Sequence, residues 1–183
     1  MEASEGTKSP SAQSVGTYME LPPRSGFGTY TYPNGDVYEG EWEGSKPNGY
    51  GTYTSHSGGV YRGRFMNGSL NGHATVQWGD GSVYVGDVED FCASGYGTLT
   101  RPDGTVHEGQ YSNGVPNGHG WGTVPDGTRI EGEFKDGKPC GRMVATDAMG
   151  RVTEVCCGDV KMSFTSIKTE GGRELSEDEV CIG

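Results

Sequence analysis

The stretch Tyr38–Gly51, which reads YEGEWEGSKPNGYG, decides the fold because its pattern returns every 23 residues. The five-residue motif that opens it recurs at 61–65, 84–88, 107–111 and 130–134. Each copy carries a further glycine eleven residues after its start, and these glycines are Gly49, Gly72, Gly95, Gly118 and Gly141. A fixed period of this length is typical of a repeat architecture, in which each unit is one small supersecondary element.

The opening motif of each unit alternates between large apolar residues and charged ones. In the first copy, Tyr38 and Trp42 are the apolar residues, and Glu39 and Glu41 are the charged ones. Alternation with a period of two predicts a strand with one apolar and one solvated face. The glycine between them, Gly40 in this copy, weakens a strand unless something approaches closely. We therefore predict that a ring from a neighbouring strand lies over it.

A second strand is expected in every unit after the glycine at its twelfth position, which we interpret as part of a turn. The expected second strands are 51–55, 74–78, 97–101 and 120–124. Asp-Gly pairs follow them, and such pairs favour tight hairpins. The sequence therefore predicts an all-β fold, a single-layer extended antiparallel meander of successive hairpins with degenerate capping ends.

The repeat also predicts the organisation of the chain. Residues 1–14 carry no apolar period and are expected to be a disordered tail. The array is expected over 15–152, with a degenerate first unit at 15–37 and five full units at 38–152. Residues 153–183 are expected to form a degenerate cap and an acidic tail, because the ends of a solenoid need capping.

Composition excludes several classes of protein. The chain has 183 residues, 34 of them glycine, and only 31% are hydrophobic, so a thick globular core is not expected. A net charge of −11 argues against binding to nucleic acid and against an anionic membrane surface. No apolar run reaches 18 residues, and residues 1–10 lack the apolar core of a secretory signal. The five cysteines are therefore predicted to be reduced thiols in the cytoplasm.

No catalytic or metal-binding constellation stands out. His107 occupies the first position of its unit, and His73 and His119 share the slot after the twelfth-position glycine, so a packing role is expected for all three. Cys156 and Cys157 are adjacent and would point to opposite faces of a strand, which disfavours a shared metal ion. We therefore expect no cofactor, no metal and no enzyme activity.

These residues carry a resemblance to a known family. The recurring pattern of Tyr38–Gly51, with its paired glycine slots, resembles the MORN repeat (membrane occupation and recognition nexus). The resemblance implies a non-catalytic scaffold that binds a helical or extended segment of another protein, in a cytoskeletal, ciliary or flagellar assembly. Two alternatives stay open at this stage, which are peripheral phospholipid binding and a regulatory subunit of an enzyme.

The candidate site is an aromatic groove along the apolar face of the sheet. Without a second layer, such a face should stay partly open to solvent and mark an interaction site. The groove residues are Tyr38, Trp42, Tyr53, Tyr61, Phe65, Tyr84, Tyr111 and Phe134. Phe91 stands where units two, four and five place a glycine, and either a tolerated loop variant or a contact site would explain it. Homodimerisation through the strand edges is a further alternative.

Overall fold

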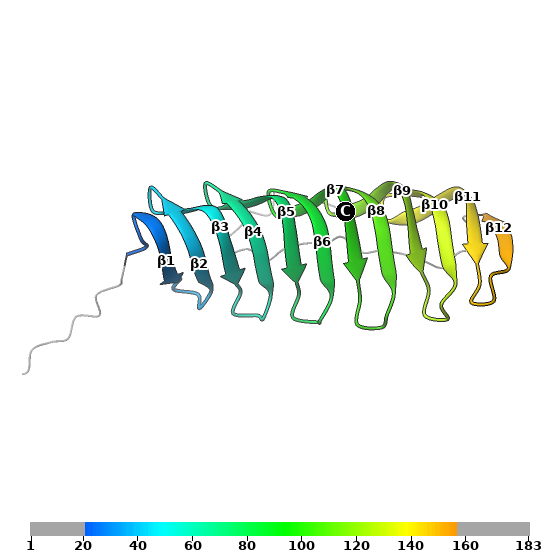
Figure 1. Cartoon of the computed structure of the whole chain (residues 1–183), viewed down its shortest axis with the longest axis horizontal. Helices are drawn as coiled ribbons and strands as arrows, with labels where there is room; N and C mark the ends of the chain where they lie inside the picture. Colours follow the sequence, from blue (N-terminus) through cyan, green and yellow to red (C-terminus); the bar gives the residue numbers. More distant parts are fainter. Residues whose placement is uncertain (1–20, 157–183) are drawn as a thin grey trace, which may run out of the picture.

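Residues 21–156 form a single sheet of twelve antiparallel strands that pair in the order of the sequence (Figure 1). This computed structural model describes residues 21–156. The strands are β1 (Ser25–Thr31), β2 (Val37–Glu43), β3 (Lys46–Thr54), β4 (Val60–Met66), β5 (Ser69–Gln77), β6 (Val83–Glu89), β7 (Cys92–Thr100), β8 (Val106–Ser112), β9 (Val115–Thr123), β10 (Arg129–Lys135), β11 (Lys138–Thr146) and β12 (Val152–Cys156). The predicted all-β meander is confirmed.

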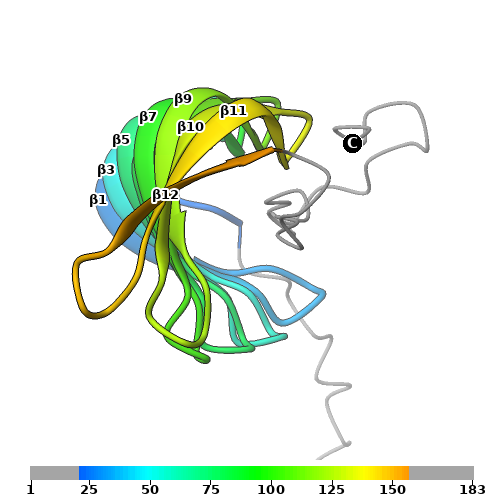
Figure 2. The same ribbon diagram turned by 90° about the vertical axis from the view of Figure 1, so that its right-hand side faces the viewer.

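The sheet is curled about its long axis, so that it has an inner and an outer face. Seen along that axis, successive hairpins stack behind one another and together form an open trough (Figure 2). A single layer can bury side chains only where its curvature brings them together, which is on the inner face. β1 and β12 are the two edges of the sheet. No helix in residues 21–156 is long and apolar enough to cross a membrane.

Two-residue turns join the strands within each unit. Both turn residues have positive φ, as in Asn67 at +52° and Gly68 at +94°, which is the geometry of the hairpin turn that matches strand twist. In the third unit the turn is Asp90-Phe91, and Phe91 has a φ of +63°. A bulky residue rarely adopts this conformation. The ring of Phe91 packs edge-on against Tyr61 and Phe65 at 6.3 and 6.2 Å, so this loop variant also contributes to the apolar cluster.

The second strands begin earlier than the sequence predicted. β3 starts at Lys46, directly after the turn, and the register between β2 and β3 shifts between Gly40 and Trp42. Gly49, which we assigned to the turn, lies in this irregularity at a φ of +111°. A side chain is strained at such an angle, which explains why every unit carries a glycine there. The twelfth-position glycine is therefore a bulge residue, and that part of the prediction is wrong.

In units one and three, the central glycine pairs with a second glycine that lies beneath a tyrosine ring. Gly40 pairs with Gly51 across β2 and β3. A Cβ atom on Gly51 would lie 2.3 to 2.7 Å from the Oη, Cζ and Cε2 atoms of Tyr38. The ring belongs to the same strand as Gly40 and extends onto its neighbour, so the prediction of a ring from another strand is wrong for Gly40. The tyrosine hydroxyl donates a hydrogen bond to the carbonyl oxygen of Glu41 at 3.2 Å. Glu41 has no paired residue on β3 because it lies at the register shift, so this bond gives its carbonyl oxygen a partner.

The same arrangement recurs in unit three, where the hydroxyl of Tyr84 donates to the carbonyl of Asp87 at 2.8 Å. Unit two differs because Ala74 replaces the second glycine of the pair. There a Cβ atom on Gly63 would meet Ala74 and Leu70, and no tyrosine is among its nearest neighbours. The tyrosine of that unit, Tyr61, has its hydroxyl end against Gly59 instead.

Some predictions concern residues that are described only in part or not at all. The half-unit at 26–32 is present as β1, whereas the strand expected at 15–19, the tail at 1–14 and most of the C-terminal cap lie outside the described residues. Cys140 and Cys156 are free thiols, but Cys92 is disulfide-bonded. The prediction of reduced cysteines is therefore wrong for Cys92.

The contact between Tyr84 and Gly97 can be tested by adding one methyl group. A Cβ atom at Gly97 would lie 2.3 to 2.6 Å from the ring and hydroxyl of Tyr84. We expect Gly97→Ala to lower the free energy of unfolding by about 1–3 kcal/mol, as overpacking does elsewhere. Ala74→Gly, at the equivalent slot of unit two, is the control and should cost less than about 1 kcal/mol. Urea unfolding measures both. An unchanged midpoint for Gly97→Ala would show that the ring does not lie over this glycine.

Candidate protein-binding site

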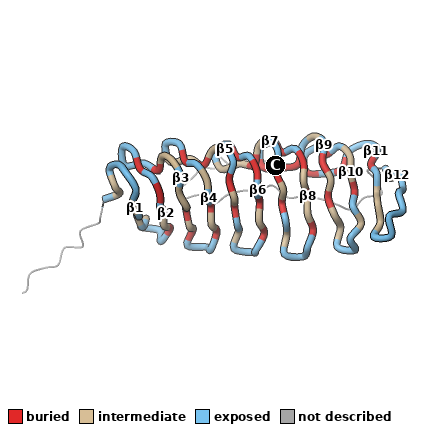
Figure 3. The backbone as a smooth tube through the Cα atoms, in the orientation of Figure 1, coloured by how far each residue is buried: buried red, intermediate tan, exposed pale blue. Residues whose placement is uncertain are grey.

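The eight predicted groove residues all lie on one face of the sheet and belong to one hydrophobic cluster. Each is 5% exposed or less; they are Tyr38, Trp42, Tyr53, Tyr61, Phe65, Tyr84, Tyr111 and Phe134. Figure 3 shows buried positions recurring along the strands through the whole array. The strands therefore bring together every residue that the alternation pattern selected.

Aromatic contacts connect neighbouring units. The ring of Tyr38 meets those of Trp42 and Phe65 edge-on, with centroids 5.1 and 4.9 Å apart. Tyr84 meets Tyr111 in the same way at 5.2 Å. Such edge-to-face pairs are worth about 0.5–1.5 kcal/mol each beyond the area they bury. These eight residues are buried, so the prediction that this face stays partly open is wrong for them.

Other inner-face residues keep part of their surface exposed. Packed against the cluster and only partly buried are Tyr30, Tyr32, Trp78, Phe91, Val124, Ala145 and Val155. At the N-terminal end, the rings of Tyr30 and Tyr32 lie 5.0 Å apart, and they contact Trp42 and Tyr53, each at 6.1 Å. The inner face thus has a buried aromatic floor and a partly exposed apolar surface at this end.

A buried polar residue holds the N-terminal end of the inner face in place. The Asp36 carboxylate, 2% exposed, accepts hydrogen bonds from the hydroxyl of Tyr53, from the backbone N–H of His56 at 2.8 Å and from Asn34 at 2.6 Å. Burial alone would raise the pKa of Asp36, but the bonds from Tyr53, His56 and Asn34 outweigh it and lower the pKa to about 2. The contacts with His56 connect the loop before β2 to the loop after β3.

In unit four a histidine takes the place of the first tyrosine. The ring of His107 is fully buried, 4.7 Å from Phe134 and 5.1 Å from Tyr111, and its Nδ1 atom lies 2.7 Å from the hydroxyl of Tyr111. Burial, with a smaller contribution from Arg101, lowers the pKa of His107 to about 4. The predicted packing role is confirmed for this histidine, which is neutral at pH 7.

The packing role predicted for His73 and His119 is wrong, because both are exposed on the outer face. The same position of the repeat carries an exposed side chain on each odd-numbered strand from β1 to β9. We call these five side chains the outer stripe, and they are Phe27, Tyr50, His73, Tyr96 and His119. The signal was present in the sequence. Tyr50 precedes the inward-facing Tyr53 by three residues, an odd number, so it must point to the opposite face.

The described residues offer little for chemistry beyond binding. Within residues 21–156 there is no group of three or more His, Cys, Asp or Glu side chains that could hold a metal ion. The carboxylates Asp80, Asp103 and Asp126 accept hydrogen bonds from backbone N–H groups two residues further on, at 2.8 to 2.9 Å. These carboxylates therefore stabilise turns.

Comparison with known proteins identifies the family. The MORN repeat matches residues 23–37, 38–60, 61–83, 93–106, 107–129 and 131–142, which together make up more than half of the chain. The protein belongs to the MORN-repeat family. Members of this family carry non-enzymatic repeats that act as interaction modules for proteins or membranes. The stretch 84–92, which carries the unusual Asp90-Phe91 turn, lies outside the matches.

Solved structures show only distant likeness. The TCP domain of SAS-4 (dCPAP), solved with a proline-rich motif of Ana2 (dSTIL) of Drosophila melanogaster, is 12% identical, with a TM-score of 0.45 and 69% of each chain covered. A streptogramin B lyase is 11% identical, with a TM-score of 0.19, and the alignment covers 70% of this chain and 53% of the lyase. Neither likeness carries an argument at these scores. A search of the curated proteins gave no significant match.

The burial of His107 predicts a loss of stability in mild acid. The pKa of His107 is about 4 in the folded protein and 6.5 for the free side chain. Between pH 4 and pH 6.5 the unfolded chain therefore binds more protons than the folded one. Stability should therefore fall as the pH drops from 6.5 to 4, by up to about 3 kcal/mol. His107→Tyr, which restores the tyrosine of units one to three, should flatten this slope. Urea unfolding at several pH values measures it, and an unchanged slope in the variant contradicts the assignment.

Proposed function

We propose that the protein is a non-catalytic scaffold that binds a segment of another protein along the inner face of its curled sheet. The observation that carries this proposal is the set of partly exposed apolar residues that recurs along the inner face, from Tyr30 and Tyr32 to Val155, with no second layer among residues 21–156. Exposed apolar surface that is continuous along a face usually marks an interaction site. An elongated trough suits a helical or extended segment, because both are long and narrow.

The N-terminal end of the inner face should supply most of the binding energy. Tyr30 and Tyr32 are partly exposed there, and the buried rings of Trp42 and Tyr53 support them from below. Partly exposed aromatic residues with rigid support are the usual energetic centres of an interface. Toward the C-terminal end, the slots equivalent to Tyr30 and Tyr53 hold Gly122 and Ala145, which offer less area.

Family membership also supports the cellular setting that we propose. We place the scaffold in the cytoplasm, in a cytoskeletal or ciliary assembly, as the resemblance to MORN proteins implies. A fluorescent fusion of the full chain, imaged together with microtubule and axoneme markers before and after detergent extraction, tests this. Release of all signal by the detergent would count against it.

The binding face can be mapped in cells with a photoreactive phenylalanine analogue. We expect crosslinks to one and the same partner from Tyr32 and from Val124, which are both partly exposed on the inner face. Thr75 and Thr98 are the controls, because they alternate with buried residues of β5 and β7 and so face outward, and they should give no crosslink to that partner. Crosslinks from the outer positions alone would contradict the proposal.

Once the partner is identified, the contribution of Tyr30 and Tyr32 to the binding free energy can be measured. Tyr30→Ser combined with Tyr32→Ser should weaken binding by about 2 kcal/mol or more, as removal of aromatic anchors does at other interfaces. Glu131→Gln on the outer face should change affinity little. Isothermal titration calorimetry measures both, after a thermal melt confirms folding. Unchanged affinity in the double variant, or recovery of the chain on anionic liposomes in a flotation assay, would favour another binding mode.

A further inference from the structure

The outer face carries an ordered aromatic stripe that neither the inner-face site nor the hydrophobic core uses. Within it, Phe27 is 72% exposed, Tyr50 69% and Tyr96 55%. Neighbouring strands lie about 4.8 Å apart, so stripe residues two strands apart recur every ~10 Å. An exposed ring leaves a large apolar area in water, and regular repetition of such rings is typical of a binding surface.

Ionised side chains alternate with the rings across the strands. Phe27 pairs with Glu41 across β1 and β2, and His73 pairs with Asp87 across β5 and β6. The outer face of β2 is acidic along its whole length, because Glu39, Glu41 and Glu43 are all exposed on it. None of these three carboxylates forms an ion pair within residues 21–156.

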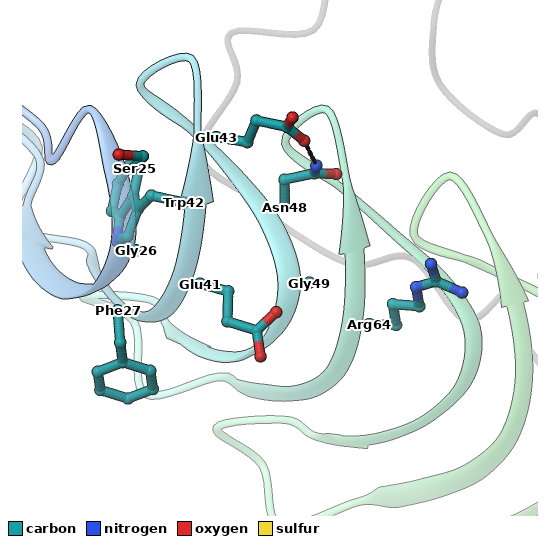
Figure 4. Close-up of a pocket in the computed structure, with 9 residues that line it drawn as sticks. All are labelled: Ser25, Gly26, Phe27, Glu41, Trp42, Glu43, Asn48, Gly49 and Arg64. Carbon is teal, nitrogen blue, oxygen red and sulfur yellow. Dashed lines mark hydrogen bonds between the residues drawn. The ribbon is translucent and has the colours of Figure 1, made fainter.

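A shallow depression lies at the N-terminal end of the stripe. Figure 4 shows it between β1, β2 and β3, with the carboxylate of Glu41 near its centre, that of Glu43 beside Asn48 at one edge, and the ring of Phe27 at another. Asn48 donates a hydrogen bond to Glu43 and holds that carboxylate in position. Arg64 bounds the far side, so a positive charge entering the depression would be directed toward Glu41.

We propose that this end of the outer stripe binds a lysine- or arginine-rich segment of a partner protein. A cationic side chain in the depression meets two carboxylates and lies within reach of the exposed rings, so ion pairing and cation–π attraction act together. The charged partners across the strands are Glu41 beside Phe27 and Arg64 beside Tyr50. The cationic side chain of the segment therefore belongs next to Glu41, at the N-terminal end of the stripe.

Charge decides between a basic protein segment and other occupants. The chain has a net charge of −11, and the only basic residues at positions two and four of the five repeat motifs are Arg62 and Arg64 of unit two. A polyanion such as a nucleic acid would be repelled by this face. The site is independent of the inner-face proposal, because its residues alternate with the buried ones along the same strands and point the opposite way.

The test uses a fluorescent probe peptide, (Lys-Gly-Ser)5, and the full-length protein. Fluorescence anisotropy should show binding at low salt that weakens as salt is added, as exposed ion pairs require. Glu41→Gln with Glu43→Gln should weaken binding at least fivefold. The matched control is Glu133→Gln with Glu154→Gln, which removes the same charge at the far end of the array and should weaken binding less than twofold.

A second pair of variants tests the rings. Phe27→Ser with Tyr50→Ser should weaken binding at least fivefold, whereas Val144→Ser with Met149→Ser, both distant and exposed, should have little effect. All these side chains are exposed, so folding should persist, and circular dichroism checks it. Equal losses for the two carboxylate doubles would show attraction by overall charge alone and overturn the proposal. No binding at millimolar peptide, or equal binding of (Glu-Gly-Ser)5, would also overturn it.

Discussion

The structure depends on the close approach of a tyrosine ring to a pair of glycines. Residues 21–156 contain no second layer, so the apolar side chains of this sheet pack against one another. Tyr38 places its ring and hydroxyl over Gly51, where no Cβ atom could fit. The glycine pair Gly40 and Gly51 lets the ring lie against the backbone, and the ring excludes water from that backbone. The glycines that weaken the strands locally therefore make the inner face compact.

The same constraint accounts for the variation among units. In unit two, Ala74 replaces the second glycine, and the hydroxyl end of Tyr61 lies against Gly59. Ala74 and Leu70 then fill the space over Gly63. Where His107 replaces the tyrosine, the hydroxyl of Tyr111 meets the imidazole at 2.7 Å. Each substitution keeps the inner face filled, because a gap in a one-layer core would expose backbone as well as side chains. The outer face carries no such constraint, and it is there that ring and charge patterns remain exposed.

Much of this fold could be predicted from the sequence because the same pattern of apolar, charged and glycine residues occurs in five successive units. The alternation around Gly40 gives the strands, their order and the composition of the inner face. The positions of the bulge and of the turn could not be predicted, because they depend on backbone geometry that the 23-residue period does not show. Gly49 is predicted as a turn residue but lies in a bulge, and the two-residue turn of this unit lies earlier, at 44–45.

The candidate site was harder to predict than the fold. Alternation selected the inner-face rings correctly, but it could not show how completely Trp42 and Phe65 would be covered by their neighbours, since coverage depends on curvature. His73 and His119 are predicted to pack, yet their slot also holds Tyr50, whose odd spacing from Tyr53 places the whole slot on the other face. Sequence patterns thus identify which residues share a face, whereas exposure follows from the curl of the sheet.

The most direct test of the ring-over-glycine account is an NMR measurement of the α-protons of Gly51 and Gly97. A proton beneath an aromatic ring is shielded by the ring current and shows nuclear Overhauser contacts to the ring protons. The structure predicts strong upfield shifts for both glycines, with contacts to Tyr38 and Tyr84 respectively, and loss of the Gly97 shift in Tyr84→Leu. Random-coil α-proton shifts at Gly51 and Gly97, without contacts to either ring, would contradict it.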